Sequence, residues 1–516
     1  MNQIETTQGC LLADPNMLGC TGPHSGGLVL LSLLLMLATL VFFAWVGYRA
    51  AKGKTLDEDS YISARGTQGS LRIGLSLFAS GMGIWLLFGP PEVGYYGGLF
   101  DVLGYALSAA IPFLLLAHLG PMIRSRLPMG VTLADYVRSR VGRPMQVYVG
   151  LISILYMFTF LFAEFTAIGK AMDFLFGYPP LIAILPVAIF TAAYTAYGGL
   201  PASLQTDRWQ AWAIIWLMAI TLVMIFASDI GDTISNAKAP GHWGPGGSIT
   251  HVDFASFQSG LALVIAITAA EMFSQGNWQR NWASKDEESL RKGAWLAAAL
   301  VFPLMLLMGF MGTVAAGQGP LDDPSTAFFW TLDPSPVLML IFVVLVIALV
   351  CSSADTLQNA IIASISRDIS NGSMSLRQAR LATILLVPVA VYLAVTMQAA
   401  SVFQIFLFAD LLAAATVAPV FLLLWDNTQP NAALGGAVAG LLSVVAYGFA
   451  TADLSTGIGY LTSPTNESGL ANLEVFLSAL IGSAVVTVAG SYTMSEEAAG
   501  IAPLDSFARL AAGPHG

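Results

Sequence analysis

The sequence predicts an all-α membrane protein of about 13 transmembrane helices. Of its 516 residues, 56% are hydrophobic and only 10% are charged, so water cannot solvate most of the surface. Apolar runs recur from position 27 to position 494, each long enough to cross about 30 Å of hydrocarbon as a helix. Because lipid cannot satisfy backbone polar groups, these runs must be helical.

Lysine and arginine gather in every second loop. Four basic clusters lie within residues 49–72, 124–143, 280–292 and 367–380. By the positive-inside rule these loops lie on the cytoplasmic side of a cell membrane. This orientation puts the N-terminal tail (1–26) outside and the C-terminal tail (496–516) inside. The clusters are short and separated by spans, so nucleic acid is a poor candidate partner, whereas the lipid bilayer is the expected one.

Charge alternation and hydropathy together place the individual spans. They are predicted at 27–49, 72–93, 98–120, 146–172, 178–197, 201–228, 256–276, 293–316, 336–365, 379–398, 400–425, 432–451 and 473–494. No soluble stretch longer than about 30 residues separates them, so residues 27–495 form a single membrane domain.

With no catalytic domain and no histidine metal motif, we expect no enzyme activity. Cys10 and Cys20 in the external tail can close a small disulfide.

The second span departs from a plain lipid-facing helix. Gly81, Gly83, Gly89, Pro90 and Pro91 fall within a dozen residues. Glycine permits unwinding and proline interrupts a helix, which would free carbonyl groups to line a cavity or coordinate an ion. The alternative is a kinked packing helix with close glycine contacts.

The ninth span carries a polar face. Ser352, Asp355, Thr356 and Asn359 are spaced so that all four lie on one side of a helix. Serine and threonine alone can serve as hydrogen-bonding contacts between helices. An aspartate at this depth is costly unless it is paired, which favours a functional role.

Further carboxylates lie within or near the predicted spans. They are Glu92, Glu164, Asp207, Glu271 and Asp410. Lys170 and Arg280 fall near span ends, so we expect no matching set of buried cations. An inorganic cation or a cationic group of the solute would neutralise some of these acids.

Three stretches together resemble the solute:sodium symporters, the family of the bacterial proline and sodium/galactose symporters. Residues 79–87 (ASGMGIWLL) look like the broken first core helix, and residues 194–210 (YTAYGGLPASLQTDRWQ) look like the family signature. Ser352-Ser353, followed fifteen residues later by Asp368, looks like the sodium-binding eighth core helix. The resemblance covers roughly residues 30–495.

The resemblance implies a LeuT-like core of two inverted five-helix repeats after one extra N-terminal helix. The repeats would cover about 72–228 and 256–425, with broken helices in spans two and seven. Sodium (Na+) would bind backbone carbonyls and hydroxyl groups at Ala79, Met82, Leu349, Ser352 and Ser353. A second cation, or a proton, would bind at Asp207, Ser352, Asp355 and Thr356, although the family pattern has a hydroxyl-bearing residue where Asp355 stands.

By the same resemblance, the solute would lie between the broken helices. Its expected contacts are Gly81, Met82, Gly83, Trp85, Tyr156, Glu271, Met272, Phe273, Gln275, Phe408 and Asp410. Gly81 stands where the proline symporters carry an aspartate, so proline is not inferred as the substrate.

The sequence thus predicts a sodium-coupled symporter of a small polar solute that works by alternating access. The excess of buried acids favours a zwitterion, an amine or a neutral nitrogenous molecule over a polyanion. Two alternatives remain: a solute-sensing membrane domain of a signalling protein, and a proton-coupled or uncoupled permease of the same fold.

Overall fold

The computed structural model is helical in all its long elements, and it describes residues 26–53, 57–227, 254–318, 320–331, 336–467 and 469–493. The N-terminal tail, with the disulfide predicted between Cys10 and Cys20, lies outside these residues. The first half contains α1 (Gly26–Ala51), α2 (Glu58–Ser63), α3 (Ser70–Gly81), the 3₁₀ turn η1 (Ile84–Leu87), α4 (Gly89–Tyr96), α5 (Leu99–Arg126), α6 (Leu133–Val141), α7 (Arg143–Phe176) and α8 (Pro180–Ala227).

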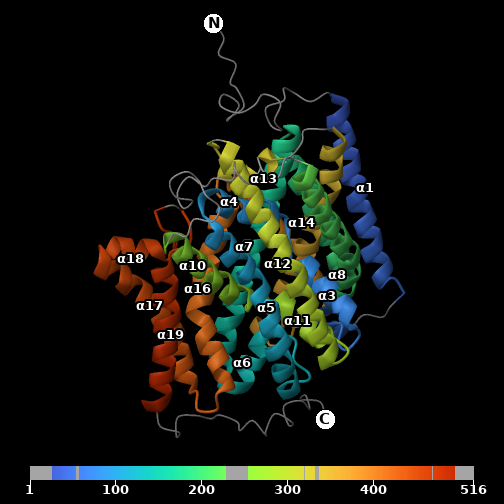
Figure 1. The fold of residues 1–516 in the computed structure, drawn as a ribbon. Helices are drawn as coiled ribbons and strands as arrows, with labels where there is room; N and C mark the ends of the chain where they lie inside the picture. Colours follow the sequence, from blue (N-terminus) through green and yellow to red (C-terminus); the bar gives the residue numbers. More distant parts are fainter. Residues whose placement is uncertain are drawn as a thin grey trace.

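The second half continues the bundle. It contains α10 (Phe254–Glu271), α11 (Gln275–Ala283), α12 (Glu287–Gln318), η2 (Pro324–Thr326), α13 (Ala327–Trp330), α14 (Pro336–Ser364), η3 (Ile365–Ile369), α15 (Leu376–Thr396), α16 (Val402–Phe421), η4 (Leu422–Leu424), α17 (Pro430–Thr451), α18 (Leu454–Tyr460) and α19 (Leu473–Thr493). Figure 1 shows α1 at one edge of the bundle and α17 to α19 at the opposite edge.

The predicted spans are all found as helices, with some shifted ends. In the described residues, 11 helices are individually long and apolar enough to cross a membrane, and α3 with η1–α4 makes a twelfth that is bent by 58°. Helix α8 holds two predicted spans, which accounts for the thirteenth. Helix α5 runs to Arg126, beyond the predicted end at 120, and α10 stops at Glu271, before the predicted end at 276.

Helix α8 is two helices that fold back on each other at Gly199. This glycine has a φ of 58°, a left-handed value that favours glycine, and an added Cβ would lie 2.4 Å from the Tyr61 carbonyl oxygen. Tyr194 and Thr206, on either side, both donate hydrogen bonds to Asp355 Oδ2, at 2.7 and 3.0 Å. In a straight helix these residues would be about 18 Å apart along the axis, so the chain must reverse between them.

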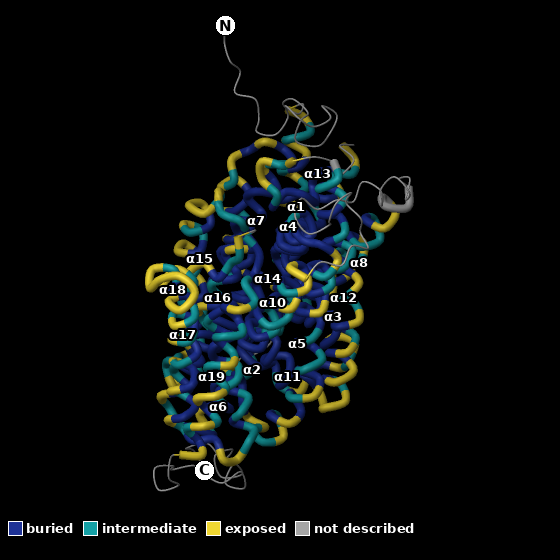
Figure 2. Tube along the Cα trace, turned by 60° about the vertical axis from the view of Figure 1, so that its left-hand side comes forward, coloured by how far each residue is buried: buried dark blue, intermediate teal, exposed yellow. Residues whose placement is uncertain are grey.

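Helix α14 lies at the centre of the bundle. Every residue from 345 to 364 is buried, which is typical of a helix surrounded by others. Figure 2 shows buried residues concentrated in the interior and exposed residues on the outer faces. The exposed side chains on the outer helices include Leu34, Leu385, Leu442 and Val485, as expected for a surface in contact with lipid.

The four basic clusters meet at one end of the bundle. Arg65 Nη1 donates to the carbonyl oxygen of Pro128 at 2.9 Å, and Arg124 Nη1 donates to that of Ser284 at 2.8 Å. Arg143 Nη2 reaches the carbonyl of Ile369 at 2.7 Å. Each bond joins two different clusters, so the basic loops share one side of the membrane.

We predict that Asp355→Ala lowers the melting temperature of the purified protein by several degrees. The change removes the acceptor that the buried hydroxyls of Tyr194, Ser203 and Thr206 share, and each lost hydrogen bond costs about 0.5–1.5 kcal/mol. Thermal unfolding in detergent measures the effect. As a control, Glu288→Ala removes an exposed ion pair with Lys292 and should leave the melting temperature unchanged; equal melting of both variants would contradict the role given to Asp355.

Candidate functional site

The second predicted span is interrupted at Met82 and Gly83, here called the first break. Helix α3 ends at Gly81, where the Ala79 carbonyl accepts from the Met82 amide at 3.2 Å, and Gly83 is fully extended. Pro90 and Pro91 do not cause the break, because they lie in the first turn of α4, where a missing N–H group costs little. The glycine-rich half of the motif therefore opens the helix.

The Glu164 carboxylate of α7 fills the space beside the first break. Glu164 Oε2 accepts from the Ile84 amide at 2.9 Å, and Oε1 accepts from the Trp85 amide at 3.4 Å. These amides begin a new helical turn and have no partner within it, so a carboxylate is a favourable acceptor for them. A Cβ on Gly83 would lie 2.1 Å from Glu164 Oε1, so only glycine fits there.

The predicted sodium ligands of α14 lie on the other side of this carboxylate. Ser353 Oγ donates to Glu164 Oε2 at 2.6 Å, whereas Ser352 Oγ donates to the Leu349 carbonyl within its own helix at 2.8 Å. Glu164 therefore connects the first break to α14. From the sequence, Glu164 is a carboxylate within a span and is not assigned to this site. Only the tertiary structure shows that its carboxylate occupies the space where Gly83 has no side chain.

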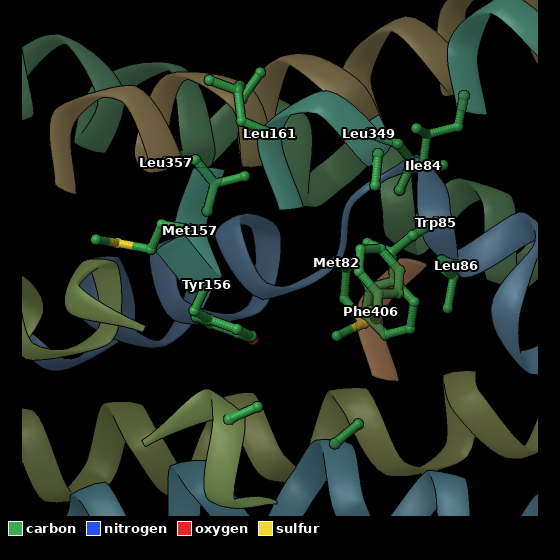
Figure 3. Packing of buried hydrophobic residues seen from close by; sticks show 14 of the residues in the cluster. Met82, Ile84, Trp85, Leu86, Tyr156, Met157, Leu161, Leu349, Leu357 and Phe406 are labelled. Carbon is green, nitrogen blue, oxygen red and sulfur yellow. The ribbon is translucent and has the colours of Figure 1, made fainter. Parts of the chain in front are cut away.

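A cavity opens next to the first break. Its lining combines seven aromatic rings with two carboxylates and contains no lysine or arginine. The lining residues are Gly81, Met82, Trp85, Tyr105, Ala109, Phe113, Tyr156, Phe160, Ile267, Glu271, Phe403, Phe406 and Asp410. Figure 3 shows Met82, Trp85 and Phe406 close together beside the unwound backbone.

The two carboxylates of the cavity differ in their surroundings. Glu271, at the end of α10, accepts from Tyr156 Oη at 2.8 Å and from Asn277 Nδ2 at 3.0 Å. Asp410 on α16 is 2% exposed and has no hydrogen bond or ion pair with any of the described residues. A buried carboxylate without a partner is costly, which favours a functional role for Asp410.

A second break lies opposite the first. Helix α10 ends at Glu271 and α11 begins at Gln275, so the seventh predicted span is interrupted as expected. A second hollow, lined by residues that include Ser274, Asn277 and Ser353, shares Gly81, Trp85, Tyr156, Phe160 and Glu271 with the aromatic cavity. The hollow beside the breaks therefore extends to Ser353 of α14.

Five predicted solute contacts do not line the aromatic cavity. Gly83 faces Glu164, and the Met272 carbonyl accepts from Trp278 Nε1 at 2.8 Å. Gln275 bonds the Val131 carbonyl at 2.6 Å, which ties α11 to the loop before α6. Phe273 is buried in the core, and Phe408 lies on α16 outside the cavity lining, where Phe403 and Phe406 are found instead. Of the predicted solute contacts on α16, Asp410 lines the cavity and Phe408 does not.

The residues expected to hold a second cation surround a buried guanidinium group. Arg280 is fully buried, against the expectation that it would lie at a span end, because α11 continues the broken span into the protein. Its Nη2 donates to Asp207 Oδ2 at 3.0 Å and to Thr356 Oγ1 at 2.8 Å. Asp355 is held by the hydroxyl groups of α8. A side chain of the protein therefore supplies a positive charge among these predicted ligands.

A helix bundle with two interrupted helices around a buried aromatic cavity that holds two carboxylates is the architecture expected of a secondary transporter with a LeuT-like core. The profile of the sodium:solute symporter family matches residues 61–327. The chain belongs to this family. It is therefore a multi-pass membrane transporter, not an enzyme.

Relatives of known name support the assignment. The chain is 31% identical over 436 residues to the spermidine transporter DUR31 of Candida albicans, which covers 82% of this chain and 80% of that protein. It is 24% identical over 353 residues to a sodium/glucose cotransporter of Vibrio parahaemolyticus, covering 61% and 63% of the two proteins.

Solved structures confirm the fold. A substrate-bound, outward-open sodium-coupled sialic acid symporter superposes with a TM-score of 0.67 at 15% identity, covering 90% of this chain and 98% of that one. A nucleobase-cation-symport-1 family transporter gives a TM-score of 0.54 at 14% identity, covering 88% and 99%. Likeness at this level of identity concerns the fold alone.

We predict that Arg280→Met destabilises the protein by about 3–5 kcal/mol, because it leaves Asp207 as an unpaired buried charge. Adding Asp207→Leu should recover much of the lost stability, since the double variant buries no unpaired ion. Apparent melting temperatures in detergent test both changes. If the double variant is less stable than Arg280→Met alone, the pair is not the dominant interaction of this site.

Proposed function

We propose that this protein is a sodium-coupled symporter that carries a small amine cation across the membrane. The observation that carries the proposal is the aromatic cavity beside the first break, where Glu271 and Asp410 face the same space without a lysine or arginine.

The lining suits an organic ammonium group. A cation near Asp410 gains a charge-assisted contact in a low-dielectric space, where such contacts are stronger than in water. Trp85, Tyr156 and Phe160 line the cavity, and ammonium groups are attracted to aromatic rings. A polyanion would face two carboxylates and no basic side chain, so it is a poor fit.

The named relative agrees with this chemistry. The Candida protein is a spermidine transporter by name, and spermidine is an amine that is protonated at neutral pH. Two carboxylates from different helices could accommodate two ammonium groups of one molecule. We therefore infer that diamines and polyamines are among the substrates.

Family membership and the position of Ser353 support sodium coupling. The Ser353 hydroxyl lies beside the Glu164 carboxylate, which also bonds the Ile84 amide at the first break. Hydroxyl and carboxylate oxygens suit a hard cation. Because the solute cavity and the second hollow share five residues, an ion at the serine pair and a solute at Asp410 would act on the same unwound segment.

In the proposed cycle, sodium binds from outside and favours the outward-open state, and solute binding then permits closure. The basic end of the bundle faces the cytoplasm, with the N-terminus outside and the C-terminus inside. Each positive charge moved inward gains about 2.3 kcal/mol per 100 mV of membrane potential, so a cationic solute is itself drawn into the cell.

We predict that Asp410→Asn lowers the uptake of radiolabelled spermidine or putrescine into proteoliposomes by at least about tenfold, because the ammonium group loses its charged partner. Diamines should compete with uptake by the unaltered protein, whereas glucose should not. The control Asp453→Asn changes a cap of α18 outside the cavity and should transport normally. Competition by glucose but not by amines would refute the substrate class.

We predict that the double variant Ser352→Ala, Ser353→Ala folds but loses sodium stimulation of uptake, because both candidate hydroxyl ligands are removed. Proteoliposomes with sodium and proton gradients imposed separately measure this. Unchanged sodium dependence in the variant would refute the site, and uptake driven by the proton gradient alone would identify a proton-coupled permease.

A further inference from the structure

Glu164 is a buried carboxylate to which the proposed function has so far given no role of its own. It lies in the middle of α7, within the membrane, and is fully buried. Among the residues that the structure describes, no lysine, arginine or histidine forms an ion pair with it. An ionised carboxylate in such a place is costly unless a cation joins it.

The partners of Glu164 leave it able to bind a cation. A carboxylate has about four lone-pair sites, and three donors are present: two backbone amides and one hydroxyl. The amide contact from Trp85 is long, at 3.4 Å. The Ser353 hydroxyl can rotate, so that its oxygen faces a cation placed between it and the carboxylate.

The place of this carboxylate carries the argument further. Glu164 lies between the backbone of the first break and Ser353 of α14, the two elements to which the sodium site is assigned. Gly83 leaves the room that the carboxylate occupies. A sodium ion bound by these elements would therefore lie within reach of an anionic oxygen.

We propose that Glu164 is an anionic ligand of the transported sodium ion. This inference rests on the proposed function, since it concerns the same ion. Sodium replaces the hydrogen bond between Ser353 and Glu164 with two cation–oxygen contacts. The positive charge of the ion balances the negative charge of the carboxylate. The amides of Ile84 and Trp85 stay bonded to Glu164, so ion binding fixes the unwound segment.

The arrangement links the ion to the solute through one residue. The amide of Trp85 bonds Glu164, and its ring lines the aromatic cavity, where it packs edge-on against Phe406 at 6.2 Å between ring centroids. Fixing the Trp85 backbone therefore orders one wall of the solute site. Sodium should raise the affinity for the solute through this contact.

Binding of radioactive ²²Na+ to the purified protein tests the proposal. Glu164→Gln keeps the size of the side chain and removes its charge, so its affinity for sodium should fall at least about tenfold, which corresponds to about 1.4 kcal/mol. Glu164→Asp keeps the charge but draws it back by one methylene, and should weaken sodium binding by a smaller factor and alter the preference between sodium and lithium. Asp453→Asn serves as the control for expression and purification, and it should bind sodium with the affinity of the unaltered protein.

The possible outcomes separate the inference from the proposed function. Sodium binding by Glu164→Gln equal to that of the unaltered protein would overturn the role of Glu164 while leaving sodium coupling intact. If Glu164→Gln does not fold, unchanged sodium affinity and selectivity in Glu164→Asp would overturn it equally. Absence of sodium binding in the unaltered protein would instead contradict the proposed function itself.

Discussion

The rest of the site depends on one interaction, the contact between the Glu164 carboxylate and the bare amides at the first break. An interrupted helix within a membrane exposes backbone groups that lipid cannot satisfy, so the protein must provide partners. Ile84 and Trp85 find theirs in Glu164, which Ser353 also contacts. The same carboxylate thus connects α7, the first break and α14, and it lies where we propose that sodium binds.

Buried charge is handled in three different ways in this bundle. Asp207 is neutralised by Arg280, and Asp355 is surrounded by the hydroxyls of Tyr194, Ser203 and Thr206. Glu164 and Asp410 lack an ion-pair partner among the described residues. In the first two arrangements the carboxylate has partners within the chain: an ion pair for Asp207 and three hydroxyl donors for Asp355. The last two leave room for cations from outside the chain, which is the physical basis for assigning them to the ion and the solute.

The α8 hairpin shows how the fold positions these groups. Gly199 permits the reversal because only glycine accepts both its left-handed backbone and the close approach of Tyr61. The reversal brings Tyr194 and Ser203 to the same aspartate on α14. That central helix is then fixed against both arms, with Ser353 facing the first break. A turn motif far from the cavity in sequence therefore sets the position of the predicted ion ligand.

The sequence by itself determined the helices, the alternation of their loops and the break in the second span, because each follows from local composition: apolar length, positive charge, and glycine in a hydrophobic run. The break in the seventh span was expected from the family resemblance. Family resemblance also predicted Asp410, Glu271 and Trp85 as solute contacts, and all three line the aromatic cavity. Tertiary structure alone decided which turn of α16 faces the cavity, placed Phe406 there in place of Phe408, buried Arg280 against Asp207 and brought Glu164 to the first break. These features depend on the rotation of each helix about its axis and on contacts between residues as far apart as 84 and 164, which no local pattern encodes.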